Sequence, residues 1–93
     1  MNHFFRREQR KHQRYRVLKE GKIIRGAHHS SIWVIIRDLS VGGARVRVSP
    51  AEPIPHTFEL LVVNEKLLFP AIVKWRKGEM VGVAFVSEPR PMV

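Results

Sequence analysis

The chain of 93 residues has no cysteine, and it has only 8 acidic residues against 17 lysines and arginines. Without cysteine it forms no disulfide and offers no thiolate to a metal, which fits a reducing compartment. Its hydrophobic runs fall short of the about 18 residues that a membrane-spanning helix needs. Residues 1–16 lack the hydrophobic centre of a secretory signal. We therefore expect a single domain in the cytoplasm.

The signatures of common enzymes are missing as well. The sequence contains no P-loop, no GxSxG and no HExxH pattern, and its acidic residues form no pair suited to general acid–base catalysis. His28 and His29 are adjacent, so on a strand their side chains would diverge, and no thiolate or carboxylate lies nearby to complete a metal site. We predict a protein that is not an enzyme and that has no bound metal or cofactor.

Positive charge is concentrated near the N-terminus. Residues 1–25 hold nine lysines and arginines against two glutamates, which accounts for +7 of the net charge of +9. A concentrated basic segment predicts an anionic partner, such as a phosphate, a nucleic acid or an acidic lipid. The alternative is a solvated arm that only keeps a small protein soluble.

The rest of the chain has the pattern of short β-strands. Segments rich in β-branched and aromatic residues alternate with turns that contain glycine, proline or asparagine. We expect six strands, at residues 15–24, 31–38, 44–49, 57–63, 67–76 and 80–86. This spacing predicts an all-β fold, an antiparallel barrel or sandwich. The expected organisation is a basic, flexible arm at 1–14, a barrel at 15–88 and a short tail at 89–93.

The arm contains two arginines, Arg10 and Arg14, in the order RKHQR. In a helical or turned segment, residues four apart point the same way, so the two guanidinium groups would converge. Each planar guanidinium can bind two oxygens of a phosphate, and arginine also bonds the O6 and N7 edge of guanine. Alone, however, this spacing is more typical of a solvated charge run, because two arginines four residues apart occur by chance in any basic arm.

The stretch RDLSVGGARV, residues 37–46, lies between two expected strands. Asp38 and Ser40 are typical of turns because they bond the nearby backbone, and Gly43 permits a positive φ. A carboxylate and a hydroxyl at a barrel rim are also suited to accept hydrogen bonds from a purine, and Gly43 would let a flat ring approach. In the last strand, Gly82 and Ala84 share a face, which also indicates a close approach of backbone or ligand.

In combination, RKHQR and DLSVGG in a β domain of this size resemble the motifs of the PilZ domain family. The flank EQRKHQRYRV and the closing hairpin IVKWRKGEMVGVAFV are similar too, so the resemblance covers about residues 8–88. It implies a six-stranded antiparallel β-barrel that serves as a bacterial receptor for the second messenger cyclic di-GMP. By this resemblance Arg10 and Arg14 would hold phosphates and guanine edges, and Asp38 and Ser40 would bond a guanine that Gly43 leaves room for.

The resemblance also carries secondary expectations. Gln9 and Lys11 stand where the family often has arginine, and they are possible secondary contacts. Ligand binding would reorder the arm and relay the signal to a separate, unidentified protein partner, with motility, exopolysaccharide production and surface attachment as the expected outputs.

Two other functions remain open. A small basic barrel can bind RNA or single-stranded nucleic acid through exposed aromatic rings. The bulky aromatic residues here fall mostly on hydrophobic patterns that predict core positions, which makes this function less favoured; they are Trp33, Phe58, Phe69, Trp75 and Phe85. The third possibility is a structural adaptor whose site binds no ligand.

Overall fold

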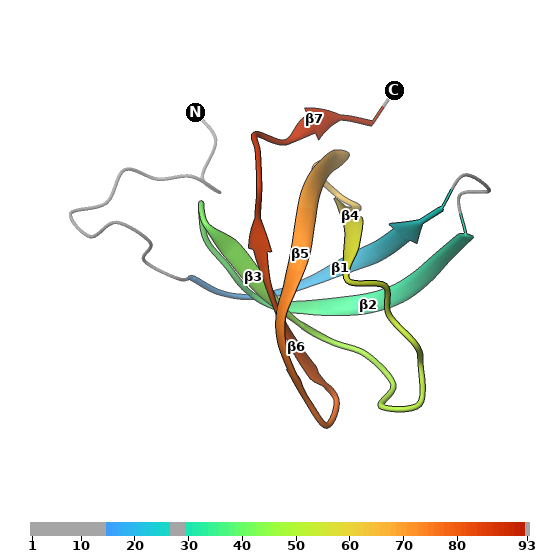
Figure 1. The fold of residues 1–93 in the computed structure, drawn as a ribbon. Helices are drawn as coiled ribbons and strands as arrows, with labels where there is room; N and C mark the ends of the chain where they lie inside the picture. Colours follow the sequence, from blue (N-terminus) through green and yellow to red (C-terminus); the bar gives the residue numbers. More distant parts are fainter. Residues whose placement is uncertain (1–14, 27–29, 93) are drawn as a thin grey trace.

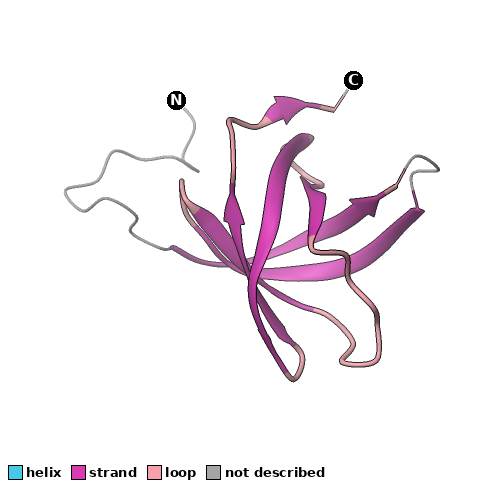
Figure 2. Cartoon of the chain, viewed as in Figure 1, coloured by secondary structure: helices cyan, strands magenta, loops and turns pink. Residues whose placement is uncertain are grey.

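The computed structural model describes residues 15–26 and 30–92, and within these residues the chain is built from strands and loops with no helix (Figure 2). The strands are β1 (Tyr15–Arg25), β2 (Ser30–Leu39), β3 (Gly43–Arg47), β4 (Thr57–Val62), β5 (Leu67–Lys77), β6 (Met80–Phe85) and β7 (Arg90–Pro91). Six of them form the expected antiparallel β-barrel, in the order β4-β1-β2-β3-β6-β5, which closes through pairing of β4 with β5 (Figure 1).

The barrel closes around one hydrophobic core. Alternate residues of each strand point inward, so that Ile23, Ile36, Leu60, Phe69 and Val81 are fully buried. Closure leaves few unpaired strand edges, which a small open sheet would expose to solvent along its whole length.

Two β-bulges shift the register of the strands that matter for the site. One lies in β2 between Ile36 and Asp38, opposite β3, and the other in β5 between Val73 and Trp75, opposite β6. A bulge inserts one extra residue into one strand, so it changes which side chains face the same way.

Pro70 lies inside β5, where the sequence predicts an edge position or a bulge. It pairs with Glu59 of β4 without a bulge, and its carbonyl accepts a hydrogen bond of 2.9 Å from the Val86 amide. The nitrogen and the carbonyl of one strand residue face the same side, so Pro70 N lies beside Val86, which follows the last residue of β6. The ladder with β4 therefore needs no N–H from Pro70.

The C-terminal tail adds β7, a short strand that the sequence does not predict. Arg90 pairs with Leu68 of β5, and its guanidinium bonds both carboxylate oxygens of Glu59 on β4 at 2.7 Å. This contact between distant segments, rather than a local preference, gives the tail its strand conformation.

Candidate functional site

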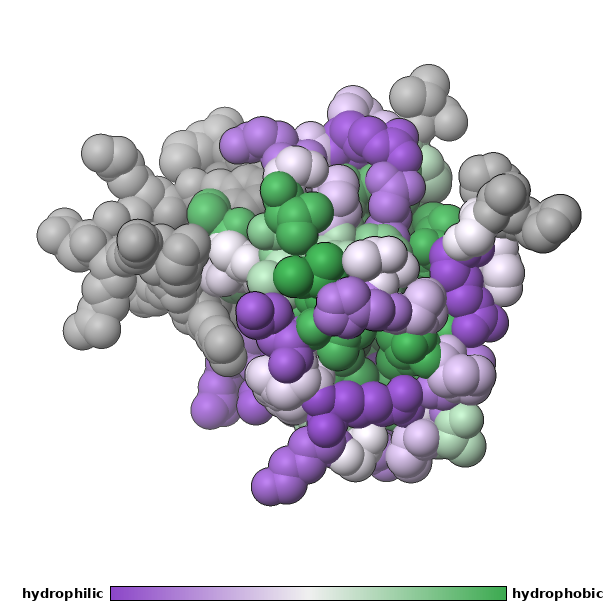
Figure 3. Space-filling model, in the orientation of Figure 1, coloured by the Kyte–Doolittle hydropathy of each residue, from purple (hydrophilic) through white to green (hydrophobic). Residues whose placement is uncertain are grey.

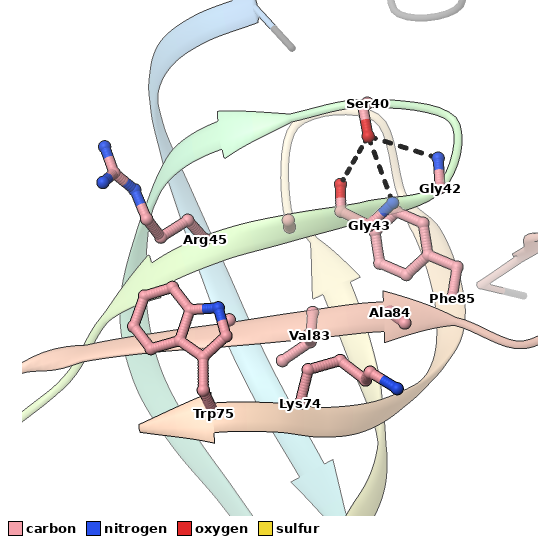
Figure 4. A pocket seen from close by; sticks show the side chains of 11 residues that line it. Ser40, Gly42, Gly43, Arg45, Lys74, Trp75, Val83, Ala84 and Phe85 are labelled. Carbon is pink, nitrogen blue, oxygen red and sulfur yellow. Dashed lines mark hydrogen bonds between the residues drawn. The ribbon is translucent and has the colours of Figure 1, made fainter. Parts of the chain in front are cut away.

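The turn between β2 and β3 is organised by one hydroxyl group. Ser40 Oγ accepts hydrogen bonds from the amides of Gly42 and Gly43, each at 3.2 Å, and donates one to the Gly43 carbonyl at 3.3 Å (Figure 4). The Ser40 amide also donates to the Gly43 carbonyl at 2.9 Å. Ser40 is itself buried. The turn chemistry predicted for this stretch is therefore present, and Ser40 is its centre.

Gly43 has a different structural role from the one expected. Among the described glycines only Gly26 and Gly78 have a positive φ, so the expectation of a positive φ at Gly43 is wrong. Instead, Gly43 pairs with Ala84 of β6, and a Cβ added to it would lie 2.2 Å from the Val83 carbonyl oxygen. The position requires glycine because two backbones meet there.

Four residues form one row across four neighbouring strands. Asp38 on β2 pairs with Arg45 on β3, Arg45 pairs with Gly82 on β6, and Gly82 pairs with Trp75 on β5. The indole of Trp75 lies on Gly82, since a Cβ at this glycine would be 2.2 Å from the indole nitrogen. The close approach at Gly82 is therefore made by a side chain, whereas the sequence predicts an approach of backbone or ligand.

Next to this row the outer surface is hollowed. The hollow has a volume of about 440 Å³, which is within the size range of small-molecule sites. Its floor consists of small residues on β3 and β6, namely Gly43, Ala44, Gly82 and Ala84. We call it the outer hollow.

Larger side chains border the outer hollow, and Figure 4 shows them on both sides of the two floor strands. Arg45, Lys74 and Trp75 provide two cations and a flat ring, while Phe85 borders the end near the Ser40 turn. Lys74 and Trp75 are consecutive and would normally face opposite sides of a strand, but the bulge in β5 allows both to line the hollow. The surroundings are suited to a flat, anionic ligand.

Asp38 lies under the guanidinium of Arg45. Arg45 Nη2 is 2.6 Å from Asp38 Oδ2, and the carboxylate is 8% exposed while the Arg45 side chain is 40% exposed. The two groups are close without hydrogen-bond alignment, so Asp38 Oδ2 and Arg45 Nε have no hydrogen-bond partner. Buried polar atoms of this kind are uncommon, and they leave acceptor and donor capacity next to the hollow.

The structure brings three of the predicted site residues together. Asp38, Ser40 and Gly43 lie at one end of the barrel, where Ser40 and Gly43 line the outer hollow and Asp38 lies behind Arg45. The other four predicted positions, Gln9, Arg10, Lys11 and Arg14, lie outside the described residues.

The sequence did not identify Arg45, Lys74 and Trp75 as site residues. Trp75 is 43% exposed and Trp33 is 59% exposed, so the prediction that these tryptophans lie in the core is wrong, whereas Phe58 and Phe69 are buried as expected. Figure 3 shows hydrophobic side chains that remain on the surface between hydrophilic ones. The signal that could have identified Trp75 is Gly82, because a glycine inside a strand often marks a place where a ring packs flat.

The family comparison agrees with this arrangement. A family model described as the PilZ domain matches residues 8–92, nearly the whole chain. The chain therefore belongs to the PilZ domain family, a family of cyclic di-GMP receptors whose domains bind ligands rather than catalyse reactions. No curated protein matches the chain.

Two features are absent from the described residues. The part of the chain that the structure describes contains no helix that is long and apolar enough to cross a membrane. Within the same residues, no group of three or more histidine and acidic side chains is placed to hold a metal ion.

Proposed function

We propose that this protein is a bacterial cyclic di-GMP receptor that binds the dinucleotide in the outer hollow. The observation that carries the proposal is the floor of Gly43, Ala44, Gly82 and Ala84, which lies beside the DLSVGG turn. A small-residue floor allows a guanine to approach the backbone, and Trp75 at its border offers a face for stacking.

The charges around the hollow suit the phosphates of the ligand. Arg45 and Lys74 line it, and no ion pair joins Lys74 to a carboxylate within the described residues. In the proposed complex, Arg45 leaves Asp38 for a phosphate, and Asp38 then accepts the N1–H and N2–H donors of a guanine. One ion pair within the protein is exchanged for two contacts with the ligand, which limits the electrostatic cost.

Ser40 and the basic arm complete the proposed site. Ser40 holds the turn through two accepted hydrogen bonds and one donated to the Gly43 carbonyl at 3.3 Å, and in the proposed complex its hydroxyl turns this donor toward the guanine. Arg10 and Arg14 bind phosphates and guanine edges, with Gln9 and Lys11 as secondary contacts. Closure of the arm 1–14 over the barrel 15–88 alters the surface displayed to a separate protein partner in the cytoplasm, with motility and biofilm formation as outputs.

Calorimetric titration of the full chain with cyclic di-GMP tests the proposal. We expect micromolar or tighter binding, about −8 kcal/mol, and no comparable heat with GMP or a mixed-sequence oligonucleotide. Clear oligonucleotide binding without heat from cyclic di-GMP would contradict the proposal and favour the nucleic-acid alternative. The exposed rings of Trp33 and Trp75 are the observation that keeps this alternative in view.

Replacement of Arg14 by alanine is expected to weaken cyclic di-GMP binding about 100-fold, because charge-assisted hydrogen bonds contribute roughly 1.5–3 kcal/mol each. The same titration measures the effect. Lys22→Ala, which removes one positive charge from the β1–β2 hairpin, is the matched control and should bind normally. Equal weakening in both variants would show that only the net charge matters.

Trp75→Ala should weaken binding about 30-fold, since base stacking on an aromatic ring contributes roughly 1–3 kcal/mol. Gly82→Ala should have nearly the same effect although Trp75 itself is unchanged. The new Cβ would lie 2.2 Å from the indole nitrogen and would push the ring out of its position. Trp33→Ala serves as the control with unchanged affinity. If Gly82→Ala binds like the wild type, Trp75 has no stacking role.

A further inference from the structure

One half of β2 has a strand on only one side. Its pairing with β1 extends from Ser30 to Leu39, but its pairing with β3 begins only at Ile35. The segment from Ser30 to Val34 therefore has a free edge on the side where β3 would continue. In Figure 1 the chain leaves β3 as a loop and no strand follows this half of β2.

The register shows which backbone groups face this free edge. The Glu20 carbonyl accepts a hydrogen bond of 3.1 Å from the Val63 amide, so the backbone groups of Glu20 point away from β2. The backbone N–H and carbonyl groups of Ile35, which pairs with Glu20, must then point away from β1. Because this direction alternates along an antiparallel strand, the backbone groups of Trp33 and Ser31 point the same way as those of Ile35. No hydrogen bond joins the backbone of these two residues to another described residue on that side.

The free edge lies in a groove. One hollow of about 420 Å³ is lined by Trp33 and Ile35 of β2 together with Val48 and Ser49. A second hollow of about 540 Å³ brings Ser30 together with the segment from Pro53 to Pro55. The loop after β3 thus follows the edge from one hollow to the other without pairing with it.

Two arginines hold this loop in place. Arg76 donates to the carbonyls of Ser49 and Glu52 at 2.8 and 2.7 Å, and Arg25 donates to the Pro53 carbonyl at 3.0 Å. Both ends of the loop are therefore fastened to the barrel, and the groove beside β2 is built into the fold.

We propose that the free edge of β2 binds an extended, acidic segment of a partner protein as an added β-strand. Ser31 and Trp33 would supply two N–H donors and two carbonyl acceptors, the interaction by which strand addition gains its affinity. Trp33 is 59% exposed, and a large aromatic ring at a recognition surface is the typical anchor residue. The proposal goes beyond dinucleotide binding and does not depend on it.

The charges favour an acidic partner. Lys22 Nζ lies 4.4 Å from the centre of the Trp33 ring, and Arg47, whose exposed side chain lies 3.4 Å from the Glu79 carboxylate, lines the adjoining hollow. With the net charge of +9, these cations attract an acidic chain. A second copy of this protein would also carry a net charge of +9, so the two copies would repel each other. A nucleic acid has no peptide backbone that could pair with the N–H and carbonyl groups of Ser31 and Trp33, so the observations favour a protein segment over both.

A random-peptide display library selected against the full chain tests the proposal, followed by calorimetry with a synthetic peptide of the enriched sequence. We expect the enriched sequences to combine acidic residues with alternating hydrophobic ones. Ser31→Pro should weaken the peptide about tenfold because it removes one N–H that faces the free edge. Ser31→Ala is the matched control, since it changes only the side chain, and it should bind normally.

Three results would overturn the proposal. The first is a selection that enriches no sequence, and the second is a peptide that binds Ser31→Pro and Ser31→Ala equally. The third is a concentration-dependent dimer, or oligonucleotide binding, that is lost in Ser31→Pro but kept in Ser31→Ala, because the edge would then serve a second copy or a nucleic acid. Thermal unfolding of both variants checks that the barrel is intact, and Trp33→Ala, with an expected loss of about tenfold, tests the same groove without proline.

Discussion

Replacement of Asp38 by alanine is expected to weaken cyclic di-GMP binding about 100-fold, while the barrel still folds. An ionised carboxylate that accepts two donors of a guanine forms charge-assisted hydrogen bonds, and their loss corresponds to about 3 kcal/mol. Calorimetry measures the affinity, and thermal unfolding measures the stability of the same sample. Parallel losses of affinity and melting temperature would instead mean that Asp38 only supports the turn.

The ion pair with Arg45 explains why stability should change little. Without Asp38, the Arg45 side chain, already 40% exposed, can turn into solvent, so the cost should be about 1 kcal/mol. The converse variant, Arg45→Ala, leaves a carboxylate that is 8% exposed without its cation, and we expect a larger destabilisation of about 2 kcal/mol. A larger cost for Asp38→Ala than for Arg45→Ala would contradict this account of the pair.

Gly43→Ala should destabilise the folded barrel by about 3 kcal/mol, because a forced clash in a packed region typically costs this much. The added Cβ would lie 2.2 Å from the Val83 carbonyl oxygen and 3.3 Å from the Ala84 Cα. These are backbone atoms of β6, which is paired with both β3 and β5 and cannot move aside easily. For a domain of this size, the melting temperature should fall by more than about 10 °C.

Gly78→Ala is the matched control for this prediction. Gly78 has a φ of 58°, but a Cβ there would meet no atom within 4 Å, so only the backbone conformation is strained. Its cost should be about 1 kcal/mol. If Gly43→Ala melts no lower than Gly78→Ala, the contact between β3 and β6 is less tight than the structure indicates.

The strands were predictable from the sequence for a simple physical reason. Alternation of hydrophobic residues and turn residues between the segments are local signals, and each of the six barrel strands ends within two residues of its predicted bounds. The family resemblance added the barrel topology and is confirmed by the family match. The strand β7 was not predictable, because it depends on the distant pairing of Arg90 with β5 and Glu59.

The outer hollow could not be derived from the sequence, because it depends on register. Trp75 and Asp38 enter the same row only through bulges in β5 and β2, and a bulge has no firm sequence signature. Without the bulge, Lys74 and Trp75 would face opposite sides, and the strand pattern alone predicted a buried Trp75. The motif DLSVGG can be identified in the sequence, but the residues that surround it are set by the register of four strands, β2, β3, β6 and β5.

The most direct measurement of the central claim follows the two indole N–H signals of the chain by NMR during titration with cyclic di-GMP. Trp75 lines the outer hollow, whereas Trp33 lines the groove at the other end of β2. If the dinucleotide binds in the outer hollow, the Trp75 signal and the amides of Gly42, Gly43 and Ala84 should shift together, and the Trp33 signal should stay. A shift of Trp33 without a shift of Trp75 would contradict the proposed site.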